Sequence, residues 1–188
     1  GNWGKNIARN LSEMNALSCI YDPQSNIAKK ISNDLKLPNY SLKEIFFDKD
    51  IDGIVIASSA DTHINIAKQA LLNNKDVLIE KPFCLSLSDA KNISDLAEKK
   101  NKVLMAGHLL NYHNAFIKMK SLIDEDKVGS IKNIRAHRLA LGSVRQNESV
   151  VYDVAAHVIS MVLSITKNLP TNLQVQSIHH NSPFGRVP

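Results

Sequence analysis

Three groups of residues in the chain have types and spacing that could do chemistry. The first is the stretch Gly1-Asn2-Trp3-Gly4, which comes directly before a helical pattern. It matches the last four positions of G-x-G-x-x-G, in which glycines permit a tight turn and backbone N–H groups at the helix start bind a pyrophosphate. A pair of glycines is also common at ordinary helix entries, so this stretch alone leaves both interpretations open.

Asp22 favours the nucleotide interpretation. It ends a short apolar stretch, 18 residues after Gly4, where a dinucleotide fold places the carboxylate that binds the ribose diol. An Asp-Pro turn with Pro23 is the local alternative. Such a carboxylate would repel a 2′-phosphate, and Pro23-Gln24-Ser25 offers no arginine to neutralise one, so we expect NAD rather than NADP.

The second group is Glu80-Lys81-Pro82, which follows the apolar stretch 77–79. Ligands of parallel sheets bind beyond the carboxyl ends of the strands, so Lys81 is expected at a functional edge. A lysine beside a cation or in a desolvated site can have its pKa lowered enough for proton transfer. The alternative is a solvated charge at a strand end.

The third group is Asp153 and His157, four residues apart in a strongly apolar helical stretch. This spacing places both on one helix face. Buried polar groups without partners cost several kcal/mol, at roughly 2–7 each, so the pair either satisfies itself and the backbone or serves a site.

A further polar cluster, from His108 to His113, follows the apolar stretch that ends at Ala106. It is expected at the same carboxyl edge as Lys81. His108 and His113 are five residues apart, which is not a metal-ligand spacing, so no metal site is expected.

These residues need elements to position them. Periodicity predicts helices over 5–14, 25–35, 42–47, 62–73 and 86–100, and buried strands over 17–21, 51–57, 76–79 and 103–106. Strands and helices that alternate in this way predict βαβ units and a parallel, doubly wound α/β sheet. We therefore expect a Rossmann-type dinucleotide-binding domain over 1–107.

After Gly107 the rhythm changes. Helices are expected over 115–123 and 150–165, and strands over 131–141 and 173–179. This pattern predicts a second, α+β domain over 108–188, for substrate binding and oligomerisation. The chain opens with Gly1 inside the glycine motif, so we expect the first strand of the sheet to be missing and the second domain to be incomplete. A chain that truly began there would bind a dinucleotide weakly.

The composition is that of an ordinary globular protein, with 188 residues, 44% hydrophobic and 22% charged. No stretch resembles a membrane span or a signal peptide. The net charge of +5 is scattered and forms no basic run typical of a nucleic-acid site. A mild positive excess also suits an anionic small molecule, and the charge alone does not decide between them. Cys19 and Cys84 fit neither a disulfide framework nor a zinc site. We expect a cytoplasmic protein without nucleic-acid or membrane partners.

In order along the chain, these motifs together resemble the Gfo/Idh/MocA oxidoreductases. The resemblance rests on the glycine fragment, Asp22, the stretch 57–63 (ASSADTH), Glu80-Lys81-Pro82, the stretch 107–113 (GHLLNYH) and Asp153-x-x-x-His157. It implies a Rossmann domain followed by an α/β domain with an open, mostly antiparallel sheet that often builds a homo-oligomer. It also implies hydride transfer between NAD or NADP and a carbon of a sugar, inositol or nucleotide sugar.

The resemblance implies site residues as well. The catalytic positions would be Lys81, Asp153 and His157, with His157 as general base. The cofactor positions would be Gly1, Asn2, Trp3, Gly4, Asp22, Ser58, His63, Glu80 and Lys81. The substrate positions would be His108, Asn111 and Tyr112, together with the catalytic residues.

Within the family, the stretches 107–113 and 139–153 look most like members that act on nucleotide-linked amino sugars and sugar acids. Three departures from such relatives concern the substrate more than the chemistry: Asn111 stands where arginine is frequent, Ala156 where proline is common and Val158 where aspartate is usual.

Other functions remain open. A short-chain dehydrogenase would need Tyr-x-x-x-Lys, and none of the four tyrosines has a lysine four residues later. A non-catalytic relative could bind the dinucleotide as a sensor or repressor, because a fold does not dictate a function. An inactive truncated remnant is the third alternative.

Overall fold

The computed structural model describes residues 2–138, 151–176, 180–182 and 185–187 of the chain. It divides into two compact units, Gly1–Gly107 and His108–Pro188. The described residues leave out Gly1 and residues 139–150. This second range includes the end of the predicted strand 131–141 and the first residue of the predicted helix 150–165.

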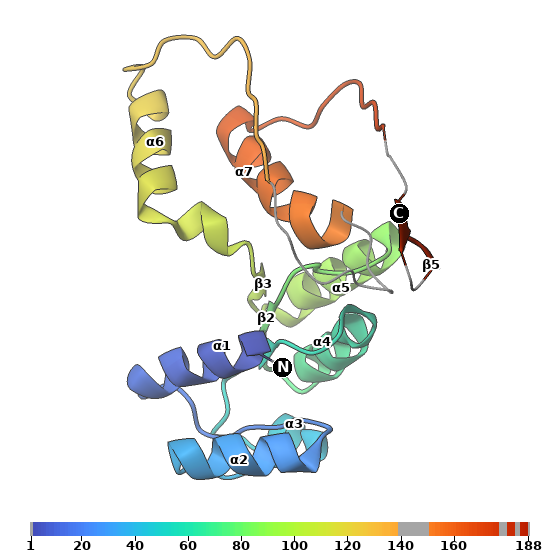
Figure 1. The fold of residues 1–188 in the computed structure, drawn as a ribbon. Coiled ribbons are helices and arrows are strands. Elements are labelled where there is room, and N and C mark those ends of the chain that lie inside the picture. Colours follow the sequence, from blue (N-terminus) through green and yellow to red (C-terminus); the bar gives the residue numbers. More distant parts are fainter. Residues whose placement is uncertain (1, 139–150, 177–179, 183–184, 188) are drawn as a thin grey trace. The chain divides into compact units, whose positions relative to one another are not determined.

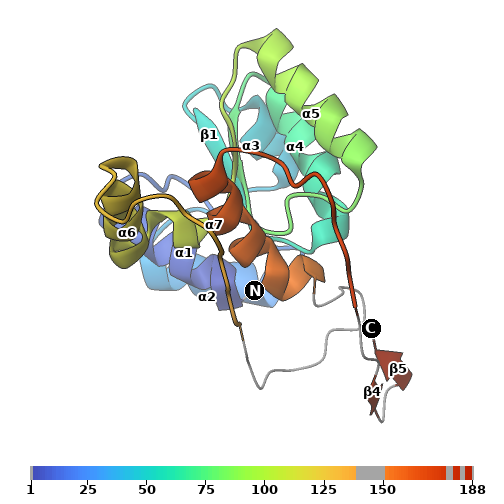
Figure 2. The ribbon, with the colours of Figure 1, turned by 90° about the horizontal axis from the view of Figure 1, so that it is seen from above.

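The first unit is built on a parallel sheet of β1 (Gly53–Ile56), β2 (Asp76–Ile79) and β3 (Leu104–Ala106), in that order. Helix α4 (His63–Leu72) connects β1 to β2, and α5 (Leu87–Lys100) connects β2 to β3. The two helices pack side by side (Figures 1 and 2). The predicted Rossmann-type parallel sheet with helical crossovers is confirmed.

The core of this unit lies between the sheet and these two helices. β-branched residues face it from the strands, and small or aliphatic residues face it from the helices, because a strand covered on both sides needs apolar residues without alternation. The buried cluster comprises Ile56, Val77, Ile79, Ala67, Ala70, Leu71, Ile93 and Ala97. Because β2 is the central strand of this core, its end is a rigid place for functional residues.

Three more helices and a 3-10 turn complete the first unit: α1 (Asn2–Glu13), α2 (Ser25–Leu35), α3 (Leu42–Phe47) and η1 (Ala60–Thr62). A capping box starts α3, in which Ser41 accepts the N–H of Glu44 and the Glu44 carboxylate accepts the N–H of Ser41. The hydrogen bonds that the Glu44 carboxylate accepts from the backbone N–H and the hydroxyl of Ser41 hold the pKa of Glu44 below its ordinary value. This local signal explains why α3 falls where the sequence predicts it, whereas the N-cap residue of α2 is Gln24, which makes no side-chain cap hydrogen bond.

The predicted strand over 17–21 is wrong. Only one parallel bridge is present there, between Ile20 and Asn39. The N–H of Ile20 donates to the carbonyl of Pro38 at 3.1 Å, and the N–H of Tyr40 donates to the carbonyl of Ile20 at 3.0 Å. A strand requires a continued ladder with a neighbour, and no described segment extends this pairing.

The second unit contains η2 (Leu109–Tyr112), α6 (Asn114–Asp124), the π-helical segment η3 (Val151–Ala155) and α7 (Ala156–Thr166). An antiparallel pair, β4 (His180–Ser182) and β5 (Gly185–Val187), follows. The predicted strands are wrong over residues 131–138 and 173–176, which have no regular structure. Alternating apolar residues form a strand only where another strand pairs with them.

None of the helices within the described residues is long and apolar enough to cross a membrane.

Candidate active site

The turn Glu80-Lys81-Pro82 lies at the carboxyl end of β2, as predicted. The N–H of Glu80 donates to the carbonyl of Ile56 at 2.9 Å, and the N–H of Gly107 donates to the carbonyl of Ile79 at 2.7 Å. The turn is therefore fixed between the ends of β1 and β3. Lys81 is half-buried, and its peptide bond to Pro82 is cis.

Glu80 is almost buried, with 9% of its surface exposed. Its Oε1 accepts the indole N–H of Trp3 at 2.8 Å, and its Oε2 accepts the backbone N–H of Lys81 at 3.2 Å. A Cβ added at Gly107 would lie 3.0 Å from Oε1 of Glu80 and 3.2 Å from its Cα. The start of α1 and the ends of β2 and β3 thus meet around one carboxylate.

His63 is 1% exposed and lies between two loops of the same edge. Its Nδ1 is 2.9 Å from the carbonyl oxygen of Pro82, and its Nε2 is 3.2 Å from the carbonyl oxygen of Ser58. The ring joins the loop after β1 to the turn after β2. The Ser58 hydroxyl lies 2.6 Å from the Thr62 hydroxyl, which donates to the carbonyl of Ser59 at 2.7 Å. His63 and Ser58 are therefore placed to hold the loops.

Helix α1 begins at Asn2, earlier than the predicted start at residue 5. Trp3 and Gly4 therefore lie in its first turn and not in a turn before it. A Cβ added at Gly4 would meet only the Cβ of Ala57, at 3.7 Å, which is ordinary contact. The N–H groups of a first helical turn have no acceptor within their helix, so they can bind an anion.

Asp22 comes two residues after the bridge at Ile20. Its Oδ1 accepts the backbone N–H of Gln24 at 2.9 Å, which closes a turn around Pro23. This geometry is compatible with both interpretations of Asp22, the local turn and the ribose-binding carboxylate. The Asp-Pro turn also fixes the carboxylate at the end of an extended segment.

The remaining predicted residues lie in the second unit. Asn111 and Tyr112 are on η2, directly after His108, and η2 packs against α7, which carries His157. The side chain of His157 is 4% exposed. The structure thus brings the predicted substrate residues beside the helix of the predicted base.

Asp153 lies in the π-helical segment η3 and not in α7. The four-residue spacing of Asp153 and His157 therefore does not place them on one face, as it would in a continuous α-helix. Single π-helical turns occur frequently at functional sites. No sequence signal indicated this change of helix type.

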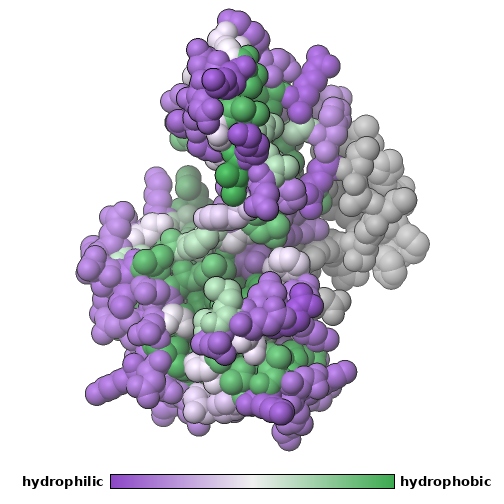
Figure 3. Space-filling model, turned by 90° about the vertical axis from the view of Figure 1, so that its left-hand side faces the viewer, coloured by the Kyte–Doolittle hydropathy of each residue, from purple (hydrophilic) through white to green (hydrophobic). Residues whose placement is uncertain are grey.

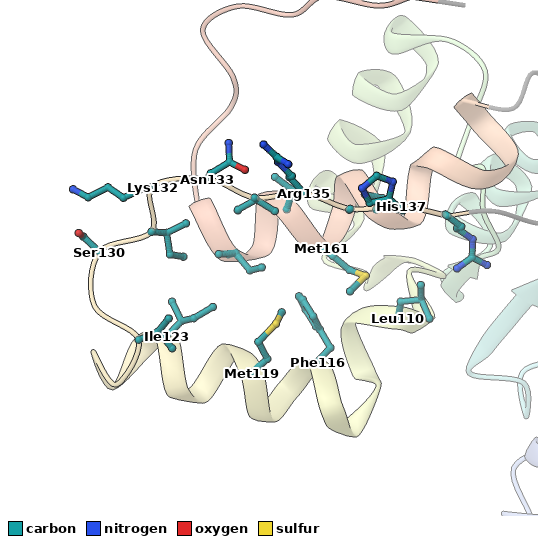
Figure 4. Close-up of a pocket in the computed structure, with 18 residues that line it drawn as sticks. Leu110, Phe116, Met119, Ile123, Ser130, Lys132, Asn133, Arg135, His137 and Met161 are labelled. Atoms are coloured by element: carbon teal, nitrogen blue, oxygen red, sulfur yellow. The ribbon is translucent and has the colours of Figure 1, made fainter. Parts of the chain in front are cut away.

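The second unit also has an apolar groove that the sequence did not lead us to expect. It has a volume of about 780 Å³ and lies between α6, α7 and residues 130–138. Phe116, Met119 and Met161 point into it (Figure 4). The apolar surface around α6 is visible in Figure 3. The spacing of Val158, Met161, Val162 and Ile165 along α7 was the available signal. None of the predicted site residues lines this groove.

Away from this edge, the pKa of Cys19 is shifted for a clear physical reason. Burial raises the pKa of the Cys19 thiol, which makes it a poor nucleophile. Within the described residues, no group of three or more histidines, cysteines or acidic residues could hold a metal ion.

Comparison with known proteins gives one family model that matches residues 1–108, described as an oxidoreductase family with an NAD-binding Rossmann fold. An uncharacterised oxidoreductase of Escherichia coli, YdgJ, is 30% identical over 142 residues, which cover 71% of this chain and 41% of that protein.

Among the solved structures that share the fold are two dehydrogenases. A UDP-N-acetylglucosamine 3-dehydrogenase of Acidithiobacillus ferrooxidans has a TM-score of 0.82 at 23% identity, and the match covers 95% of this chain and 58% of that one. A scyllo-inositol dehydrogenase of Lactobacillus casei, solved with NAD(H) and scyllo-inositol, has a TM-score of 0.75 at 16% identity, with coverages of 88% and 53%. The chain spans 34–44% of the length of the curated relatives that it matches.

Proposed function

Since this chain belongs to the Gfo/Idh/MocA family of oxidoreductases with an NAD-binding Rossmann fold, we propose that it serves hydride transfer between NAD and a hydroxyl-bearing carbon of a sugar or nucleotide sugar. The observation that carries this proposal is the placement of Lys81 at the carboxyl end of β2, joined through Glu80 to the first turn of α1. The proposed reactive lysine, Lys81, and the proposed anion-binding start of α1 thereby share one edge of the sheet.

The residues at this edge fit a dinucleotide. Gly4 leaves space beside the first turn of α1, where a Cβ would make only one ordinary contact. We propose that this turn binds the pyrophosphate and that Asp22 binds the ribose diol. The nicotinamide supplies the hydride acceptor. Residues 1–107 would form the dinucleotide-binding domain, and residues 108–188 would hold the substrate and contacts to a second copy.

Oxidation of an alcohol also releases a proton from the hydroxyl on the carbon that loses hydride. We assign His157 as the base that accepts this proton, because an imidazole titrates near neutral pH without perturbation. Lys81 would donate a hydrogen bond to the same oxygen and stabilise the developing alkoxide. Asp153 would orient the imidazole or bind a neighbouring hydroxyl. The proposal therefore needs residues from both units.

The test is a screen of nucleotide sugars and polyols with NAD, read as NADH absorbance, on the gene product that contains this chain. Lys81→Ala and His157→Ala should each lower turnover by about 100-fold to 10,000-fold and retain NADH binding. Lys99→Ala and His137→Ala are matched controls at exposed positions, and they should leave turnover unchanged.

Near-native turnover in both site variants would refute the catalytic assignment. Tight NADH binding without turnover on any substrate would favour the sensor alternative. Because His157 is buried, its variant is also followed by thermal unfolding, and a loss of folding would indicate that this histidine serves the core.

A further inference from the structure

Glu80 has no part in the chemistry proposed above, yet it is a carboxylate with only 9% of its surface exposed. Removing a carboxylate from water costs several kcal/mol unless hydrogen bonds replace the lost hydration. An apolar side chain of similar size would fill the same space without that cost. The position of Glu80 therefore calls for a role that requires its two oxygens.

The two oxygens serve different partners. Oε1 accepts the indole N–H of Trp3 at 2.8 Å, and Trp3 is 77 residues away in the first turn of α1. Oε2 accepts the backbone N–H of Lys81 at 3.2 Å. Both N–H groups donate to the same carboxylate, so a shift of this carboxylate changes both hydrogen bonds.

The backbone around Glu80 restricts where its carboxylate can lie. At Gly107 there is no room for a Cβ, which would lie 3.0 Å from Oε1 and 3.1 Å from Cδ of Glu80. On the other side of Lys81, the Nδ1 of His63 lies 2.9 Å from the carbonyl oxygen of Pro82. The backbone of Lys81 is thus held on both sides, and on the Glu80 side the carboxylate connects it to α1.

We propose that Glu80 is a positioning residue that couples the first turn of α1 to the backbone of Lys81. Through it, the helix start that binds the dinucleotide and the lysine that acts on the substrate oxygen are held at a fixed spacing. This inference rests on the proposed function for the roles of those two sites. The coupling itself concerns residues of the first unit alone.

The first experiment measures the coupling without any cofactor. Amide hydrogen exchange of Lys81 is followed by NMR in the native chain, in Glu80→Gln and in Trp3→Phe. Glutamine keeps the size of glutamate but can accept only one of the two N–H groups, and phenylalanine keeps an aromatic ring without the indole N–H. Each variant should speed exchange of the Lys81 amide by about tenfold, as expected for losing or weakening one hydrogen bond to a charged group.

Matched controls are Glu98→Gln on α5 and Tyr21→Phe, both at exposed positions. They should leave exchange at Lys81 unchanged. The decisive result is the response of the Lys81 amide to Trp3→Phe, because that amide donates to Oε2 of Glu80 and the indole N–H of Trp3 donates to Oε1. If Trp3→Phe leaves the Lys81 amide as in the native chain, the inference is overturned.

The second experiment adds the cofactor. NADH binding is titrated through nicotinamide fluorescence in the native chain, both single variants and the double variant. Each single variant should raise the Kd by about tenfold, and the double variant should raise it by less than the product of the two, because both act through one network. In turnover assays, Glu80→Gln should lower kcat more than it raises the KM for the sugar.

The two proposals fail in different ways. If the gene product that contains this chain binds no NADH, the proposed function fails, and the exchange experiment still decides the role of Glu80. If the native chain binds NADH and turns over substrate while Glu80→Gln behaves like Glu98→Gln in both assays, Glu80 is not a positioning residue and the proposed function stands.

Discussion

Among the residues expected at the cofactor, burial separates those that a dinucleotide could touch from those that hold the loops and strand ends together. Glu80 and His63 were both expected at the cofactor, and both are enclosed by protein groups, with 9% and 1% of their surfaces exposed. Gly4 and Asp22 lie where a dinucleotide could reach them. Substitution of Glu80 or His63 should therefore act through the fold, on the groups that these two side chains hold. Substitution of Gly4 should act mainly on NADH binding.

Substitution of Gly4 by alanine should separate folding from binding. The added methyl group meets only the Cβ of Ala57 at 3.7 Å, and alanine favours a helix over glycine by about 0.5–1 kcal/mol. The free energy of unfolding in urea should therefore be unchanged or higher. NADH binding should weaken, because the methyl group occupies space beside the first turn of α1. Equal Kd values for the native and variant chains would remove Gly4 from the proposed cofactor site.

Substitution of His63 by alanine should destabilise the first unit. The change leaves a cavity and removes the ring between the carbonyls of Pro82 and Ser58, at a cost of about 2–4 kcal/mol in the free energy of unfolding. Urea denaturation measures it, with His137→Ala as the exposed control. A native-like stability together with weaker NADH binding would instead place His63 in direct contact with the cofactor.

At the scale of elements, the two helices of the second unit are joined by an ion-pair network. Asp124 at the end of α6 accepts from Lys120 Nζ at 2.8 Å and from Lys167 Nζ, directly after α7, at 3.1 Å. The hydrogen bonds from Lys120 and Lys167 hold the pKa of Asp124 below its ordinary value. A lowered pKa in the folded state means that the ionised carboxylate stabilises the fold, and that this stabilisation is lost as the pH falls through the lowered pKa.

Asp124→Asn should therefore have a lower melting temperature than the native chain above about pH 5, where the carboxylate is ionised in both states. The difference should be small, because Asp124 is exposed and solvent screens the network. It should disappear at strongly acidic pH and shrink in high salt. Melting curves across this pH range test it, with Asp95→Asn on α5 as control. A difference that does not depend on pH would mean that the charge of Asp124 has no part in it.

At the scale of the whole molecule, the proposed chemistry is divided between two units that meet at Gly107. The family relation covers the first unit, and the matched relatives are longer than this chain. Cofactor selectivity depends in this proposal on residues of the first unit, whereas the proposed turnover assigns roles to Lys81 in one unit and His157 in the other. Binding and turnover are therefore separate measurements for this protein.

The chain should bind NADH at least about tenfold more tightly than NADPH, because the Asp22 carboxylate would face the 2′-phosphate of NADPH. Asp22→Asn removes the charge at nearly constant shape and should narrow this ratio. Asp34→Asn, at an exposed position of α2, should leave it unchanged. Fluorescence titration with both cofactors gives the ratios, and equal or tighter NADPH binding by the native chain would contradict the prediction.

The sequence by itself determined the helices and strands that depend on local signals. Ser41 and Glu44 fix the start of α3, Ser86 caps α5, and the uninterrupted apolar residues of β2 mark a strand covered on both sides. Strand and helix alternation was also enough to predict the parallel sheet and to place Lys81 at its carboxyl edge. Each of these conclusions uses interactions between residues close in sequence, so the pattern contains the answer.

The tertiary structure alone decided what depends on distant partners. Residues 131–138 are part of a predicted strand but have no pairing segment among the described residues, and the segment 17–21 pairs at only one residue. The hydrogen bond from Trp3 to Glu80 spans 77 residues, and the contact of His63 with Pro82 spans 19. Pairing and burial are set by which segments meet in space, and no local spacing of residue types encodes that.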